Sequence, residues 1–355
     1  MDQPRNDHPI LASGIAPGLW PTETFFALLW VDDKDAIEVP KQFPFSGRWG
    51  EIQSTSLSLN DEYRMPVKLD MVWLSIVEHK FYSVEADLPT AKLQEQWQEE
   101  DPVVGGPLLT HIVVGMAPYG WVALWLRGAR KSSLHCWIRG DEVSVPMDQF
   151  SPTTSGATID EYCQYYINND AEVRENLILN GLPDAELFGR LMKQYRYRVV
   201  PLFEQWLEHE QRWERYRADA DNVPQFSFVE IGCTDGTFDK THSDFLIEHH
   251  WSGRPEQMTL AWHTGKVEWI MYVQFDPLLT APIFERFYGA HRDTLADLLV
   301  HCDPQAKHYE LALYRYGLSA PRVLPPESYQ LIVFKNKYEH HRSIGYRLPS
   351  GAWIW

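Results

Sequence analysis

Short apolar runs and alternating stretches dominate the first third of the chain. Residues 25–31, FFALLWV, form a continuous apolar run, which predicts a buried strand. Over residues 68–85 the apolar positions partly alternate, which predicts one long half-buried strand with a bulge near Glu78-His79. A proline and a threonine then stand where a helix would start, so we expect a short amphipathic helix over residues 90–100.

The segment 111–126, HIVVGMAPYGWVALWL, is almost wholly apolar. At about 1.5 Å per residue it is too short to cross a hydrocarbon core of roughly 30 Å, and a proline and a glycine interrupt it. We therefore expect no membrane span. The pattern predicts strands over residues 110–115 and 121–127, joined at Ala-Pro-Tyr-Gly. Because the run is apolar on both faces, we expect cover on both, with the helices of residues 158–217 on one side.

Further along, strands are expected over residues 131–145, and helical spacing follows. The predicted helices cover residues 158–180, 184–198 and 201–217. The last of these rests on a recurrence every three to four residues, carried by Leu202, Trp206, His209 and Trp213. Polar residues 218–224 are expected to form a linker to a second β-rich half that begins at residue 226.

These elements predict an α+β fold, with mostly antiparallel sheets, packed helices and two β-rich halves joined by a helical segment. The predicted domains are an extended arm over 1–22, an N-terminal α+β domain over 23–220 with the helical segment 158–217, and a C-terminal α+β domain over 221–355. The order of strand, proline and amphipathic helix is similar in residues 72–97 and 267–291. A degenerate duplication therefore stays open beside a chance likeness.

Composition narrows the classes of partner. With 44% hydrophobic and 23% charged residues the chain reads as a globular protein. The formal net charge of -17 opposes binding to nucleic acid, which needs clustered cations, and opposes binding to an anionic lipid surface. Aromatic residues make up 14% of the chain, which is typical of β-rich layers or broad contact surfaces. An acidic surface of this kind can steer association with a basic protein.

No motif assigns a reaction. GxGxxG, P-loop, HExxH and GxSxG patterns are absent from the sequence. Nine of the 14 histidines lie between His242 and His341, but adjacent histidines on a strand point to opposite faces and make no ready chelate. We therefore predict no catalytic set, no cofactor and no metal. Four cysteines form no CxxC pair and are expected to be buried free thiols: Cys136, Cys163, Cys233 and Cys302.

Two stretches carry a family resemblance. A strand pattern W-x-S-h-V-E-x-x-x-Y, where h is hydrophobic, is matched by Trp73, Ser75, Val77, Glu78 and Tyr82. A second pattern, h-x-h-G-h-A-P-G-G-h-h-x-h-W-h-x-G, is matched by Gly115, Ala117, Pro118, Gly120, Trp125 and Gly128, with Tyr119 in place of a common glycine. Over roughly residues 68–220 the chain thus resembles the bacterial family of domain of unknown function 2931. This resemblance implies a kinship with envelope lipoproteins, some of them regarded as immunity proteins beside type VI secretion phospholipase effectors.

The resemblance favours an immunity or inhibitor protein, which binds a secreted type VI toxin such as a phospholipase and blocks its active site. The expected partner-binding residues are Glu95, Glu99, Glu100, Asp101, Glu204, Trp206, Glu208 and Trp213. Two alternatives remain. One is a metal-dependent hydrolase of the histidine-rich C-terminal half, where folding would have to bring His249 with Glu248, or His301 with Cys302 and Asp303, into a metal site. The other is a structural envelope protein. The N-terminus has no signal-peptide pattern, so we expect a cytoplasmic protein, or a periplasmic one if a leader has been removed.

Overall fold

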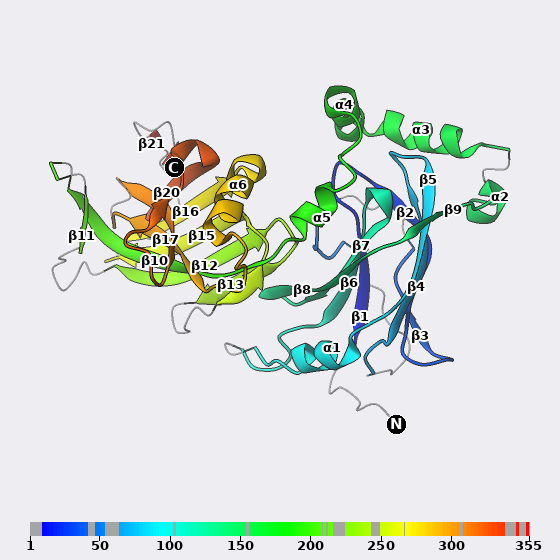
Figure 1. Ribbon diagram of the computed structural model, residues 1–355, viewed down its shortest axis with the longest axis horizontal. Coiled ribbons are helices and arrows are strands. Elements are labelled where there is room, and N and C mark those ends of the chain that lie inside the picture. Colours follow the sequence, from blue (N-terminus) through cyan, green and yellow to red (C-terminus); the bar gives the residue numbers. More distant parts are fainter. Residues whose placement is uncertain are drawn as a thin grey trace. The chain divides into compact units, whose positions relative to one another are not determined.

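The computed structural model divides into two compact units, each of which is described by itself (Figure 1). Unit 1 comprises Met1–Met192 with Asp235–Thr237, and unit 2 comprises Lys193–Thr234 and Phe238–Trp355. The residues that the structure describes are 9–41, 47–53, 64–101, 104–153, 156–207, 209–210, 212–215, 224–242, 249–265, 267–304, 308–337, 346–347 and 353–354. The fold is mostly β, with helices and with antiparallel and mixed sheets, as the sequence predicts.

Unit 1 contains two sheets. The first, which we call the front sheet, is antiparallel and has the order β3-β2-β4-β5-β9. Its strands are β2 (Thr22–Trp30), β3 (Ala36–Glu38), β4 (Lys68–Ser75), β5 (Lys80–Asp87) and β9 (Asp141–Val143). The second, the back sheet, contains β1 (Leu11–Ile15), β6 (His111–Met116), β7 (Trp121–Arg127) and β8 (Lys131–Arg139), with β1 parallel to β6 and the other pairs antiparallel. Met71 and Trp73 of the front sheet and Val114 and Leu124 of the back sheet belong to one buried core, together with Leu93 and Trp97 of helix α1 (Thr90–Trp97).

Four further helices follow β9 in the chain: α2 (Met147–Phe150), α3 (Ile159–Asn169), α4 (Ala171–Asn180) and α5 (Leu187–Leu191). The side chains of α2, α3 and α4 pack on the outer face of the front sheet, which faces away from the back sheet (Figure 1). Thr158 starts α3 through a capping box with Glu161, and the Asp170 carboxylate starts α4 by accepting from the Val173 amide at 3.0 Å. The predicted helix over residues 158–180 is thus two helices, because an aspartate cap restarts the hydrogen-bonding pattern.

Unit 2 also has a front and a back sheet. The front sheet runs β13 (Phe238–His242), β12 (Gln225–Cys233), β15 (Pro255–Thr264), β16 (Val267–Phe275), β20 (Tyr329–Lys337), β22 (Trp353–Ile354), β21 (Tyr346–Arg347). The back sheet runs β11 (Arg212–Arg215), β10 (Tyr195–Leu207), β17 (Ala296–Cys302), β18 (Tyr309–Arg315), β19 (Arg322–Val323), and β14 (His250–Ser252) pairs with β10. Helix α6 (Pro277–Tyr288) follows β16, and Asp276 caps it by accepting from the Leu278 and Leu279 amides.

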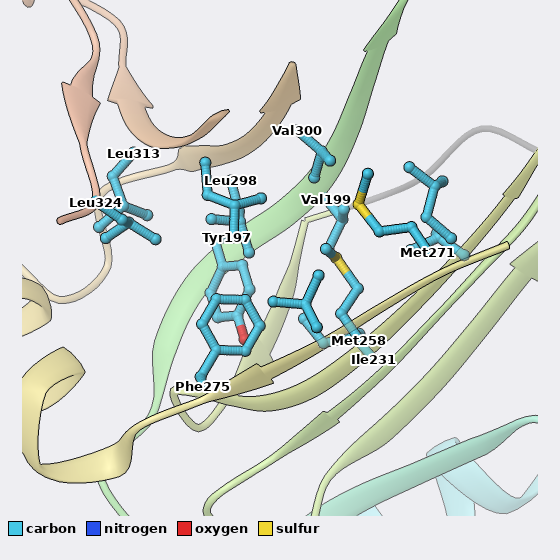
Figure 2. Close-up of a cluster of buried hydrophobic side chains, with 14 of the residues drawn as sticks. Tyr197, Val199, Ile231, Met258, Met271, Phe275, Leu298, Val300, Leu313 and Leu324 are labelled. Carbon is cyan, nitrogen blue, oxygen red and sulfur yellow. The ribbon is translucent and has the colours of Figure 1, made fainter. Parts of the chain in front are cut away.

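The core of unit 2 lies between its two sheets. Figure 2 shows Met258 and Met271 of the front sheet beside Val199 and Val300 of the back sheet. Tyr195, which is fully buried, packs against Phe284 and Tyr288 of α6. A two-sheet core closed by one helix is therefore present in each unit.

Nine strands and one helix of each unit share one topology within the described residues, whereas β11, β14, β21 and β22 of unit 2 have no counterpart among the described strands of unit 1. The elements of unit 1 follow one another in the order β1, β2, β3, β4, β5, α1, β6, β7, β8 and β9. The corresponding elements of unit 2 follow in the order β10, β12, β13, β15, β16, α6, β17, β18, β19 and β20. The front sheets have the matching orders β3-β2-β4-β5-β9 and β13-β12-β15-β16-β20, and both are antiparallel in these pairs. In both back sheets the first strand is parallel to the strand that follows the helix, β1 to β6 and β10 to β17.

The predicted helix over residues 201–217 is wrong, as is most of the one over 184–198. Residues 195–207 form the long strand β10, and 212–215 form β11. The sequence YRYRVV at 195–200 alternates polar and apolar residues, and Tyr195, Tyr197 and Val199 are buried. Pairing with β17 satisfies the backbone hydrogen bonds of β10. This pairing outweighs the recurrence of apolar residues at helical spacing that the same segment also contains. The helical segment 158–217 therefore ends at α5.

Three other predictions need correction. Residues 68–85 form the hairpin β4–β5 instead of one bulged strand, with His79 at φ 57° in the turn. Residues 11–15 of the predicted arm are β1, buried in a sheet because β6 offers it a parallel partner. The second face of the β6–β7 hairpin is covered by Trp49, Ile52 and Met192, whereas α3 and α4 cover the front sheet.

Several predicted elements are confirmed, and one lies outside the described residues. The strand of residues 25–31, the two strands joined at Ala-Pro-Tyr-Gly and the helix after Pro89 are present as β2, β6 with β7, and α1. Most of the predicted linker 218–224 lies outside the described residues, and the units divide at Met192/Lys193 instead of near residue 220. None of the helices in the described ranges is long and apolar enough to cross a membrane.

Candidate functional site

The acidic segment at the end of α1 is partly engaged within unit 1. Glu99 forms an ion pair with Lys131, and Asp101, whose side chain is 7% exposed, lies 3.5 Å from the guanidinium of Arg130. Glu95 and Glu100 are exposed. The structure therefore leaves two of the four predicted partner-binding residues of this segment open to a partner, while the other two stabilise the loop before β6.

The second group of predicted residues lies on strands instead of on a helix. Glu204 is on β10 and Trp213 on β11, and both contact His301 of β17. The Glu204 carboxylate lies 2.6 Å from His301 Nδ1, and the Trp213 ring stacks on the imidazole with 5.5 Å between centroids. Trp206 pairs with Trp213 in the strand register, but its side chain lies outside the described residues, as does all of Glu208. The pairing of β10 with β11 and β17 thus brings Glu204 and Trp213 to His301. The spacing of these three residues in the sequence did not predict that contact.

This Glu204–His301–Trp213 cluster has little nucleophilic potential. His301 is only 9% exposed, and its neighbour Cys302 points into the core on the opposite face of β17. Burial raises the pKa of the Cys302 thiol well above its ordinary value, so the thiolate is disfavoured. Burial likewise raises the pKa of Cys136 to about 11 and that of Cys163 to about 12. The predicted free thiols are present, and these three are held protonated.

Other histidines of unit 2 form separate carboxylate pairs. His249 Nε2 lies 3.2 Å from Asp297, which also accepts from Arg198 at 2.8 Å. Burial, followed by the nearby Arg198 charge, lowers the pKa of His249. Within the described residues no group of three or more histidine, cysteine or acidic side chains converges in an arrangement that could hold a metal ion. The hydrolase alternative therefore has no ligand set in this part of the chain, and its His301, Cys302 and Asp303 do not converge.

The two family-like sequence patterns meet at one turn of unit 1. Glu78, in the β4–β5 turn, accepts from the Tyr119 backbone amide at 2.8 Å and from the Tyr82 hydroxyl at 2.9 Å. Burial and then the hydrogen bond to Glu78 raise the pKa of Tyr82, which keeps its hydroxyl a donor. Gly120 has φ 77°, a conformation that favours glycine, and a Cβ there would meet the Gly140 carbonyl oxygen at 2.5 Å.

Arg139 holds the other side of this turn. Its guanidinium donates to the Tyr119 carbonyl at 3.1 Å and to Glu186 at 3.0 Å, and it lies 5.3 Å above the Trp121 ring. Tyr119 itself has φ 60°, a left-handed conformation that a glycine would adopt without strain. The residues that match the two family patterns therefore hold the β4–β5 hairpin against the β6–β7 hairpin. In this structure they stabilise the fold.

An exposed apolar patch lies on and just beyond α4. Ile178, Leu179 and Leu182 are 75%, 79% and 47% exposed, and we call them the α4 patch. The acidic side chains Glu172, Glu175 and Asp184 are exposed nearby in sequence. The predicted helix had a single apolar face, and that prediction missed the patch. The signal was the run Leu177-Ile-Leu179, which puts apolar residues on more than one face of a helix.

Comparison with known proteins identifies the N-terminal part of the chain. The family model described as "Protein of unknown function (DUF2931)" matches residues 22–181, and this part of the chain belongs to that family. The match begins at β2 and ends just after α4. It therefore includes the turn in which Glu78 contacts Tyr119, which we call the signature turn, and the helices α2, α3 and α4 over the front sheet. No match was found among curated proteins or among solved structures.

Proposed function

We propose that this protein is an immunity protein, which binds a secreted bacterial toxin and blocks its active site. The observation that carries the proposal is the α4 patch, because isolated exposed leucines are ordinary, whereas three exposed apolar side chains within residues 178–182, with acidic residues nearby in sequence, are typical of a protein contact. The patch lies on the element that closes the family-matched domain. A type VI effector, and a phospholipase in particular, is the toxin class that we propose.

The charge of the chain supports a basic partner. The chain contains 49 acidic and 32 basic residues. Exposed carboxylates lie along α4 and the turn after it, on Glu172, Glu175 and Asp184. Complementary charge raises the association rate and disfavours wrong partners. Glu95 of α1 and Glu100 of the loop after it are exposed, and both are included in the proposed surface. The encounter takes place in the compartment where the toxin acts, the cytoplasm or the periplasm.

Co-expression with the product of the neighbouring gene tests this function. We expect the neighbouring product to be toxic alone, to be tolerated in the presence of this chain, and to co-purify with it. Replacing both Ile178 and Leu179 with glutamate should weaken the complex at least about tenfold, since apolar anchors dominate such contacts. Gln149→Glu adds a charge at an exposed position of α2 and should leave the affinity unchanged. A neighbouring product that is harmless, or that does not bind, would contradict the proposal.

We also propose that the two units arose by duplication. The support is the matching order of nine strands and one helix in the described residues, including the parallel pair at the same place in each back sheet. The likeness of residues 72–97 and 267–291 falls on corresponding elements, since β5 leads into α1 as β16 leads into α6. Relatives that carry both units test it: residues aligned by topology should be more alike between the units than residues aligned at random.

A further inference from the structure

The front sheet of unit 2 has an outer face with an apolar row across four strands. The register places Phe228 of β12, Ala261 of β15, Ile270 of β16 and Phe334 of β20 side by side. In the next row Tyr272 and Ile332 are 44% and 36% exposed, and the Tyr272 ring packs edge-on against Phe334 with 5.2 Å between centroids. Ala261 is fully buried, and Phe228, Ile270 and Phe334 are half-buried. We call Tyr272 and Ile332, together with the three half-buried side chains, the open face.

In unit 1 the corresponding face is covered. Leu74 on β4 and Phe81 on β5 point away from the core between the sheets, as Ala261 and Tyr272 do on the matching strands. Their exposed fractions are 0% and 3%, because Tyr162 and Ile167 of α3 and Val173 of α4 pack on them. On the matching strands of unit 2, Ala261 is also buried, whereas Tyr272 is 44% exposed. Unit 1 therefore contains an example of a cover for the part of the face that is exposed in unit 2.

We propose that the open face binds an amphipathic helix of a partner protein, with aliphatic and aromatic side chains against the sheet and basic residues on its solvent side. The apolar layer of unit 1 supplies the precedent for a helix, since one face of a sheet is buried most simply by helices lying across it. The net charge of -17 supplies the reason for a basic partner and weighs against a second copy of this chain, because two copies would repel each other.

The border of the open face fits such a contact. Gln257, Gln274 and Gln330 occupy positions of the outer register next to Tyr272 and Ile332, and they supply neutral donors and acceptors. At one end Lys240 pairs with Glu230 at 3.1 Å and lies 4.7 Å above the Phe228 ring. An apolar centre with a polar rim is the usual anatomy of a protein interface. This inference needs neither the α4 patch nor a toxin, so it goes beyond the proposed function.

A peptide taken from this chain provides the probe. Residues 158–180, with D160K, E172K and E175K to make the solvent side basic, carry the apolar residues that cover the corresponding face in unit 1. We expect the fluorescently labelled peptide to bind the full chain in an anisotropy titration. The double variant Tyr272→Glu with Ile332→Glu should weaken binding at least about tenfold. Gln274→Glu adds one such charge on the rim and should bind as the wild type does.

Four outcomes would overturn the proposal. In the first, the wild-type chain does not bind the peptide. In the second, the double variant binds the peptide as tightly as the wild type does. Tyr272→Ser with Ile332→Ser, together with circular dichroism of all variants, separates lost binding from lost folding. A dimer in sedimentation that the double variant dissociates would assign the face to a second copy. Co-sedimentation with phosphatidylglycerol vesicles that the double variant abolishes would assign it to a membrane.

Discussion

The outer faces of the two front sheets differ although the sheets are built alike. Phe81 lies on β5 and Tyr272 on β16, the corresponding central strands, yet 3% of one residue and 44% of the other are exposed. The difference arises from the helices that come after β9, the last strand of the front sheet of unit 1. These helices, α2, α3 and α4, pack back on that sheet. Strand pairing therefore fixes which side chains share a face, and the connecting segments decide whether that face is buried.

The interiors show no such difference. Each unit buries one continuous core between its front and back sheets. Each core includes one helix, α1 after β5 in unit 1 and α6 after β16 in unit 2. Conserving the two-sheet core while varying the outer cover lets one topology provide two different surfaces. Unit 1 exposes the α4 patch, and unit 2 exposes Tyr272 and Ile332 on the outer face of its front sheet.

The largest expected effect tests the difference in cover directly. Phe81→Ala should lower the free energy of unfolding by about 3–5 kcal/mol, because it leaves a cavity under α2 and α3. Tyr272→Ala on the corresponding strand should cost about 1 kcal/mol, since 44% of the residue is already exposed to solvent in the folded state. Urea unfolding of both variants measures the two values. Equal losses would mean that the two faces are covered to the same extent.

The second prediction concerns the signature turn between β6 and β7. Gly120→Ala should cost about 2–4 kcal/mol, because the new Cβ meets the Gly140 carbonyl oxygen at 2.5 Å in a left-handed backbone. Gly181→Ala is the control. Its φ is 70° and its ψ -161°, but among the described residues no heavy atom lies within 4 Å of the added carbon, so only backbone strain of about 1–3 kcal/mol is expected, without a clash. Thermal unfolding should rank the two variants in this order.

A third prediction asks how much the Glu78 carboxylate contributes to the same turn. Glu78→Ala leaves the Tyr119 amide and the Tyr82 hydroxyl without their acceptor, so we expect a loss of about 2 kcal/mol. Glu142→Ala removes an exposed carboxylate that pairs with Lys80 at 2.7 Å, and it should cost less than about 1 kcal/mol. If the two variants unfold at the same urea concentration, Glu78 does not hold the turn.

The smallest effect should depend on pH. Glu23, which accepts from the Tyr162 hydroxyl at 2.8 Å under α3, has its pKa raised by burial. A raised carboxylate pKa means that the folded state holds the proton more tightly, so stability falls as pH rises from the unfolded value of about 4.3 through the folded value. Glu23→Gln keeps an acceptor for Tyr162 and removes the charge.

The variant should therefore match the wild type in melting temperature at acidic pH and exceed it at neutral pH. Melting curves across that range measure the difference. Glu95→Gln, at an exposed position of α1, should show no such dependence. A Glu23→Gln variant that is less stable than the wild type at neutral pH would show that the ionised carboxylate is favoured under the helices.

The sequence predicted the parts of the candidate sites unevenly. Gly120 and Glu78 stood in recognisable patterns, but nothing in the sequence indicated that the Glu78 carboxylate accepts from the Tyr119 amide. Glu204 and Trp213 were selected for the wrong reason, as residues of a helix, and their contact with His301 depends on the pairing of β10 with β17. The α4 patch was missed because apolar residues were assumed to face inward.

Local sequence alone determined the elements whose signals do not depend on a distant partner. The prolines, glycines and caps that start α1, end α4 and turn the chain between β6 and β7 act over a few residues, and the sequence located them. Tertiary structure decided the rest. Residues 195–207 carry both a helical recurrence and a strand alternation, and only pairing with β17 makes the strand the lower in free energy. The same holds for the open face, because burial is a property of the neighbours that a face finds, and those neighbours lie far away in the sequence.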